Sequence, residues 1–189
     1  MSSPVISICA RALIKIGAKA ITSFTDGTAE AEVALHLYDG CRDALLSSHP
    51  WRFATAQKKL VRLADPPFAD FAHAYQLPLD FLRAISAGMG RRGQGILYRI
   101  HENELRTDAK EVVLTYIFRA EEENFPPFFT ALLIDKLACE FCLPLTENSS
   151  RAEYLSKNAE TAFQKAKLID AQQDIPHALS DFPLISVRS

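Results

Sequence analysis

The stretch YDGCRDALLSSHPWRFA, residues 38–54, contains the transition that defines the fold: a helical pattern ends within it and an extended pattern begins. Pro50 disfavours the helical conformation for His49, so the helix should end just before these residues, with His49 as a turn or cap residue. Trp51, the single tryptophan, and Phe53 follow directly. Such aromatic side chains bury large apolar areas, so we predict that Trp51 is mostly buried where the helices meet the extended segment.

Two amphipathic helices are predicted before this transition. In the first, at about residues 5–16, apolar residues recur every three or four positions, and Gly17 suits the left-handed conformation that often ends a helix. Residues 26–28, Asp-Gly-Thr, combine turn and capping residues, so a second helix is expected at about residues 28–48.

The helical period is lost after Phe53, and the following segment alternates as strands do. Pro78 is incompatible with a helix through residues 75–80, which are expected to be extended. Residues 88–95 hold four of the seven glycines and predict a mobile loop between strands. The expected strands lie within residues 56–63, 81–85, 96–101 and 111–118, with a turn near Asn103. We therefore predict one small antiparallel sheet inserted between helices.

Helical periodicity returns with Pro126 and Pro127, which suit the first turn of a third helix. This helix should run to about Leu143, where Pro144 would end it. Its expected apolar side consists of Phe128, Ala131, Ile134, Ala138 and Phe141. Residues 150–153, Ser-Arg-Ala-Glu, match a capping box and predict the start of a fourth helix. Its alanine-rich stripe predicts close packing on a neighbour and consists of Ala152, Leu155, Ala159, Ala162, Ala166 and Ile169.

Composition supports an ordinary globular protein of the α+β class, mainly α. The 189 residues are 48% hydrophobic, which is enough for one core. We predict a single domain over residues 1–171: an antiparallel bundle of about four helices (5–48 and 126–171) with an inserted β-subdomain at about 53–118. Residues 172–189 lose the helical pattern and form an extended C-terminal tail. The net charge of −2 argues against general nucleic-acid binding, and no apolar run approaches the length that spans a bilayer.

The glycine-rich loop matches the dinucleotide-binding pattern G-x-G-x-x-G at residues 88–93. That site requires a helix N-terminus directly after the glycines, whereas a strand is expected here, so nucleotide binding is disfavoured. Arg91 and Arg92 could contact a phosphate backbone or an acidic partner, or they could lie in a solvated loop.

No catalytic, cofactor or metal site is predicted. Cys139 and Cys142 form a C-x-x-C pattern inside an apolar helix, which favours core packing over redox chemistry, and all four cysteines are expected to be reduced. No two histidines lie three or four residues apart, so a metal-binding pair on one helix is unsupported. Residues 121–123, three consecutive glutamates, are interpreted as a solvated loop.

The order of these blocks resembles the head–tail adaptor family of tailed bacteriophages, of the podovirus tail tubular protein A type, including adaptors of prophages and gene transfer agents. The resemblance covers about residues 5–170 and is carried mainly by two motif blocks, both structural. The first contains His49, Pro50, Trp51 and Phe53, and the second contains Tyr75, Leu77, Pro78 and Asp80. Arg52 stands where this family is expected to have a small polar residue.

The resemblance implies a structural role without enzymatic activity or cofactor. It implies a ring, expected to be dodecameric, that binds the portal protein, receives the tail or a stopper protein, and lets double-stranded DNA pass without specific binding. The particle would be a virion or phage-like particle assembled in the bacterial cytoplasm. The alternative from the residues alone is a helical ligand-binding or regulatory module, or an enzyme with an unrecognised site.

The C-terminal tail carries isolated apolar residues with no partner surface of their own. They are Ile175, Leu179, Phe182, Leu184 and Ile185. Such a segment either lies on its own bundle or docks on a partner and folds as it binds. The resemblance favours docking on the portal.

Overall fold

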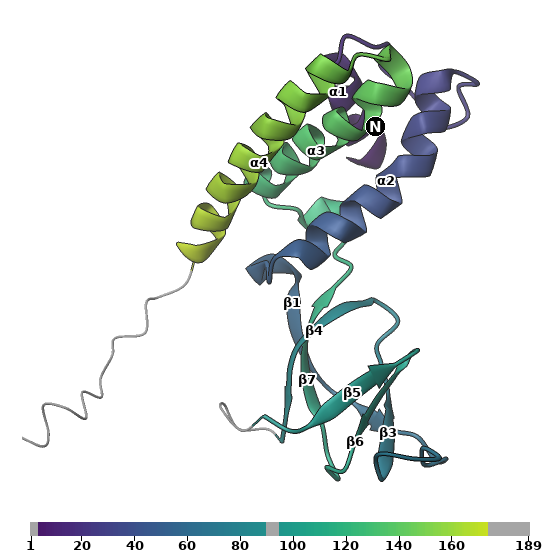
Figure 1. Ribbon diagram of the computed structural model, residues 1–189, viewed down its shortest axis with the longest axis vertical. Coiled ribbons are helices and arrows are strands. Elements are labelled where there is room, and N and C mark those ends of the chain that lie inside the picture. Colours follow the sequence, from purple (N-terminus) through teal and green to yellow (C-terminus); the bar gives the residue numbers. More distant parts are fainter. Residues whose placement is uncertain (1–3, 90–94, 174–189) are drawn as a thin grey trace, which may run out of the picture.

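The computed structural model describes residues 4–89 and 95–173. Within these residues four α-helices gather at one end of the molecule, and seven strands form two antiparallel sheets at the other (Figure 1). The predicted fold class, α+β and mainly α with a bundle of four helices and an inserted β-subdomain, is confirmed.

The first two helices begin and end as their local sequences predict. Helix α1 spans Pro4–Lys15, and Gly17 after it has a φ of 73°, in the left-handed region. Helix α2 spans Ala29–Ser48. The Thr28 side chain caps α2 by accepting a hydrogen bond from the Ala31 N–H at 3.2 Å, and His49 is its C-cap.

Two predictions about the other helices are wrong in detail. Helix α3 spans Pro127–Thr146 and includes Pro144, because a proline in the last turn removes only one backbone hydrogen bond. The helix ends at Glu147, whose φ is 52° and whose N–H donates to the Leu143 carbonyl. Helix α4 spans Ser149–Ala171. Its cap is Asn148 rather than Ser150, because the Asn148 side chain accepts from the Arg151 N–H at 2.9 Å and the helix already begins at Ser149.

Helix α3 is the centre of the bundle and packs against α1, α2 and α4. Its fully buried side chains include Phe129, Leu133, Leu137 and Phe141. Of the predicted apolar side of α3, Ala131 is exposed instead, because buried residues on this helix face three neighbours and not one stripe. On α4, Ala159 and Ala166 are buried as the stripe predicts, whereas Ile169 is 44% exposed.

The β-subdomain contains two sheets rather than the predicted one. Strands β1 (Thr55–Lys59), β7 (Val113–Phe118) and β4 (Phe81–Gly88) form one, in the order β1-β7-β4. Strands β2 (Val61–Arg62), β3 (His73–Gln76), β6 (Glu104–Thr107) and β5 (Tyr98–His101) form the other, in the order β2-β3-β6-β5. The turn near Asn103 is present, but it leads into β6, which was not predicted.

Each end of the molecule has its own hydrophobic cluster. The bundle cluster contains Trp51 and the α3 residues, and the β-subdomain cluster contains Tyr75, Leu105 and Leu114. Phe118, at the end of β7, packs against both clusters. Among the described residues, no helix is long and apolar enough to cross a membrane.

Candidate functional site

The chain passes from the bundle to the β-subdomain through residues 49–54, and Trp51 lies at the centre of this junction. Its side chain is fully buried, as predicted, and its indole N–H donates to the Leu45 carbonyl at 3.0 Å. The same carbonyl, in the last turn of α2, also accepts a hydrogen bond from the Ser48 hydroxyl at 2.7 Å. The surrounding rings are Phe53, Phe128, Phe129 and Phe163, with centroids 5.3–6.4 Å from Trp51. The first motif block is thus part of the bundle core.

The last turn of α4 is attached to the same junction through Asp170. The Asp170 carboxylate is 2% exposed and accepts hydrogen bonds from the Arg52 backbone N–H at 3.2 and 3.3 Å. The Arg52 guanidinium Nε in turn donates to the Asp170 carbonyl at 3.0 Å. His49 Nε2 lies 3.7 Å from the same carboxylate. The end of α4 therefore determines the position of the segment that leads into β1.

An ionic cluster connects α2 to the return path from β7. Arg42 Nη1 lies 2.9 Å from Glu122, and both side chains are only 12% exposed. The Tyr38 hydroxyl also donates to Glu122, at 3.0 Å. Arg119, just after β7, binds Asp43 of α2 at 2.6 Å. The interpretation of residues 121–123 as a solvated loop is therefore wrong for Glu122, because its carboxylate is the partner of two side chains of α2.

The second motif block stabilises the β-subdomain. Tyr75 is buried, and its hydroxyl donates to the Ala109 carbonyl at 2.6 Å; Leu77 is buried beside it. The Asp80 carboxylate accepts from the Tyr116 hydroxyl at 3.3 Å, and its carbonyl accepts from the Arg119 N–H at 2.8 Å. The Pro78 carbonyl accepts from Phe81, at the start of β4. The predicted extended conformation is present at residues 75–76, in β3, but is wrong for residues 79–80, which form a turn before β4.

The four cysteines lie in helices α1, α2 and α3 of the bundle. Cys9 and Cys142 are buried, and Cys41 and Cys139 are half-buried; all four are free. Burial raises the pKa of both Cys9 and Cys41 to about 12, so neither carries a reactive thiolate near neutral pH. Among the described residues, no group of three or more His, Cys, Asp or Glu side chains is placed to hold a metal ion.

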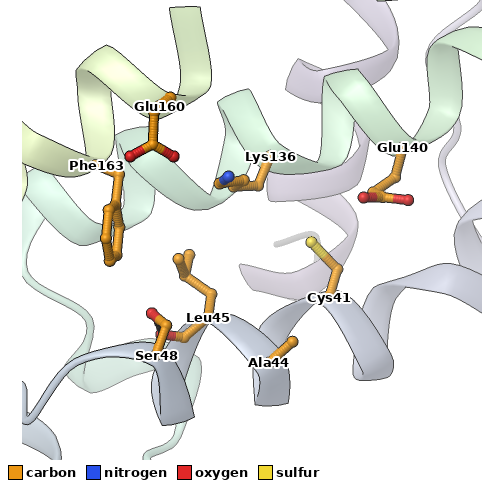
Figure 2. Close-up of a pocket in the computed structure, with 8 residues that line it drawn as sticks. All are labelled: Cys41, Ala44, Leu45, Ser48, Lys136, Glu140, Glu160 and Phe163. Carbon is orange, nitrogen blue, oxygen red and sulfur yellow. Dashed lines mark hydrogen bonds between the residues drawn. The ribbon is translucent and has the colours of Figure 1, made fainter. Parts of the chain in front are cut away.

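A groove of about 350 Å³ lies between α2 and α4, above α3 (Figure 2). We call it the α2–α4 groove; it is lined by Cys41, Ala44, Leu45, Ser48, Lys136, Glu140, Glu160 and Phe163. Helices α2 and α4 each pack on α3, but they have few contacts with each other, which leaves this side of the bundle uncovered. The volume is at the lower end of the range of about 300–1,000 Å³ that ligand pockets usually have.

The lining of the groove is partly apolar and partly charged. Figure 2 shows the Lys136 side chain between those of Glu160 and Glu140. Within the described part of the chain, Lys136 forms no hydrogen bond or ion pair, whereas Glu160 accepts a hydrogen bond from Gln164. The apolar part of the lining includes Phe163, whose ring also packs against Trp51, with 5.9 Å between the ring centroids. The groove is therefore continuous with the core at the junction.

Several residues that the sequence singled out lie outside the described residues. These are the loop candidates Arg91 and Arg92 and the tail candidates Ile175, Leu179, Phe182, Leu184 and Ile185. Of the predicted mobile loop at residues 88–95, the structure describes Gly88, which ends β4, Met89, and Gly95, which forms an isolated bridge with Gly88.

Sequence reasoning did not identify Asp170, Glu122 or Lys136. Each belongs to a helix or loop whose local pattern gives no sign of a distant partner. Comparison with known proteins adds no assignment: no protein-family model and no curated protein matches the chain.

Proposed function

We propose that this chain is a structural head–tail adaptor, which binds the portal of a phage or phage-like particle as a ring, expected to be dodecameric, and provides the docking surface for the tail. The observation that carries the proposal is the placement of the two motif blocks. Trp51 and Phe53 lie in or against the bundle core, and Tyr75 and Leu77 lie in the core of the β-subdomain. Buried aromatic and aliphatic residues on both sides of the junction hold the helical bundle and the β-subdomain in one arrangement. A ring subunit between portal and tail needs such a fixed arrangement.

The junction supports a load-carrying role over a catalytic one. The chain leaves the bundle beside Asp170 and returns beside Glu122, and both crossings are fixed by hydrogen bonds of buried or nearly buried carboxylates. Burial raises the pKa of the thiols of Cys9 and Cys41 to about 12, so these two groups are poor nucleophiles near neutral pH.

The β-subdomain has exposed apolar side chains that suit a partner. Phe68, in the loop after β2, and Leu79, before β4, are fully exposed. Exposed apolar groups of this size on loops are typical of interaction sites when several occur on one subdomain. We propose that they contribute to the docking surface for the tail or stopper protein, while the tail residues Ile175, Leu179, Phe182, Leu184 and Ile185 bind the portal.

The proposal is tested by electron microscopy of this chain mixed with the portal encoded near it. Genes for a portal, a major capsid protein and tail proteins are expected next to the gene for this chain. The micrographs should show a ring of additional density attached to the portal. Genes of an unrelated pathway, or portals that stay bare at saturating concentrations of the chain, would reject the adaptor role.

Variants in the tail assign the portal contact. Phe182→Asp and Ile185→Asp should each abolish binding to the portal, because a carboxylate cannot be buried in an apolar interface without a partner. Ser180→Asp adds the same charge to the same segment without removing an apolar side chain and should bind normally. Equal binding by all three variants would place the portal contact elsewhere.

A further inference from the structure

We propose that, in the free subunit, the α2–α4 groove binds the C-terminal segment of the same chain, with Phe182 in its apolar part. This inference does not depend on the adaptor role. The groove lies close to the end of α4. Its lining includes Ser48 and Phe163, and the last turn of α4 is bound to Arg52, four residues after Ser48, through Asp170. The segment that follows Gln173 therefore starts near one end of the groove.

The C-terminal segment is long enough to reach the groove. Phe163 lies ten residues before Gln173, which corresponds to about 15 Å along the helix axis. An extended chain covers this distance in about five residues. Ile175 and Pro176 follow the end of α4, and proline favours a change of direction there. Phe182 is six residues beyond Pro176, so its side chain can return to the level of Phe163 without strain.

The apolar lining of the groove complements the Phe182 side chain. The groove offers the aliphatic surface of Ala44 and Leu45 and the ring of Phe163, to which a second aromatic ring can pack at about 4.5–7 Å between centroids. Beside this surface, the Lys136 ammonium group has no ion-pair partner in the described part of the chain. Glu140 and Glu160 also line the groove, on either side of Lys136, so its charged part gives no net attraction for an acidic residue. The apolar surface is therefore the part of the lining that favours Phe182.

Docking in the groove makes the free subunit and the portal competitors for one segment. The apolar side chains of the tail would be covered before assembly, which reduces the exposed patch that promotes aggregation. On the portal, the tail would leave the groove. The groove is thus a holding site for the segment that the proposed function assigns to the portal.

The test uses the full chain with the photoreactive analogue p-benzoylphenylalanine in place of Phe182, without portal. After irradiation, mass spectrometry should find bonds from position 182 to peptides that contain residues 41–48, 136–140 or 160–163. The same analogue in place of Phe68, which is fully exposed, should give no such bonds. A mixture of ¹⁴N- and ¹⁵N-labelled chains separates the possible occupants: bonds within one chain are expected, and bonds between chains would show that a second copy fills the groove and overturn the proposal.

A pair of variants links the cross-link to the groove. Ala44 is exposed on the groove side of α2, and Ala131 is exposed on α3 beside α1, away from the groove. Ala44→Glu should lower the cross-link yield about fivefold or more, because the longer, charged side chain would occupy the apolar part of the groove that the Phe182 ring needs. Ala131→Glu should leave the yield unchanged, and thermal melting should show that both variants fold. Equal yields in the two variants, or bonds distributed over the whole surface, would overturn the proposal.

Discussion

The backbone N–H of Arg52 donates to the carboxylate of Asp170, 118 residues later in the sequence, with an N–O distance of 3.2 Å. The first residue of the 3₁₀ turn that leads into β1, Arg52–Ala54, is therefore bound to the last turn of α4. Since a carboxylate near the C-terminus of a helix is opposed by the helix dipole, this contact must compensate for an unfavourable position.

We expect Asp170→Ala to destabilise the protein by about 1–3 kcal/mol, because the Arg52 N–H loses its buried acceptor. Asp170→Asn retains an acceptor oxygen and should cost less. Urea denaturation measures both. Glu153→Gln is a suitable control, since Glu153 forms only an exposed pair with Lys157 and its loss should change the free energy of unfolding by less than about 1 kcal/mol. An Asp170→Ala variant as stable as the control would show that the contact contributes nothing.

Trp51→Ala should destabilise the protein by about 3–5 kcal/mol, the usual cost of deleting a large buried aromatic side chain. The loss removes the ring contacts with four phenylalanines and the hydrogen bond to Leu45. Trp51→Phe keeps most of the apolar volume and should cost less. Both substitutions remove the single tryptophan and with it the tryptophan fluorescence signal. Denaturation of the variants is therefore followed by circular dichroism. A cost below about 1 kcal/mol would contradict the central position of Trp51 in the core.

A double-mutant cycle on Arg42 and Glu122 should give a coupling energy of at least about 1 kcal/mol, because both side chains are nearly buried and removal of Arg42 takes this cationic partner from Glu122. Removal of Glu122 costs less, because Arg42 keeps its pairs with Asp39 and Asp43. The single variants are Arg42→Met and Glu122→Gln. The pair Lys59 and Glu111, which is exposed on both sides, is the matched control and should couple by less than about 1 kcal/mol. Equal coupling in the two cycles would mean that burial of the Arg42 pair has no energetic effect.

Stability should decrease as the pH falls from 7.5 to about 5.5, and His49 should contribute to this decrease. Burial lowers the pKa of His49, with Lys167, Arg83 and Arg52 acting in the same direction and the Asp170 carboxylate opposing them. The unfolded chain therefore binds a proton at a higher pH than the folded chain does. Stability is lost as the pH falls through the unfolded pKa and towards the folded one.

His49→Gln removes this titration and should flatten the dependence of the melting temperature on pH in that range. His36 is exposed on α2, and His36→Gln provides the control. An unchanged slope in His49→Gln would show that other groups cause the pH dependence.

Binding to double-stranded DNA should be weak and independent of sequence. A chain with a net charge of −2 neutralises few phosphates, and each neutralised phosphate adds affinity and salt dependence. Fluorescence anisotropy with duplex DNA at physiological salt should show no saturation at low micromolar protein. A sequence-selective complex at nanomolar concentration would falsify the conduit role and favour a DNA-binding regulator.

The sequence predicts what local chemistry determines. Thr28 caps α2 because a threonine hydroxyl reaches the helix N–H groups, and Trp51 is buried because removal of its large apolar ring from water is favourable. The sequence does not predict pairings across the chain. Asp170 is an acidic residue in a polar helix until the fold places Arg52 beside it, and Glu122 is one of three consecutive glutamates until α2 packs beside it.

The elements that the sequence did not predict also depend on tertiary contacts. Strand β6 is a short polar segment, Glu104–Thr107, that becomes a strand because β3 and β5 lie on either side of it. Pro144 is compatible with α3 because it lies in the last turn, a position that depends on where Glu147 ends the helix. In both cases the tertiary environment outweighs the local preference.

The attachment of α4 to residues 49–52 has a mechanical consequence. A force that pulls on the chain after Gln173 acts first on the last turn of α4, and the hydrogen bonds of Asp170 pass it to the backbone of Arg52. Strand β1 begins three residues later, and all of its residues pair with β7. The hydrogen bonds between Asp170 and Arg52 are thus a short path along which tension on the end of α4 reaches the β-subdomain.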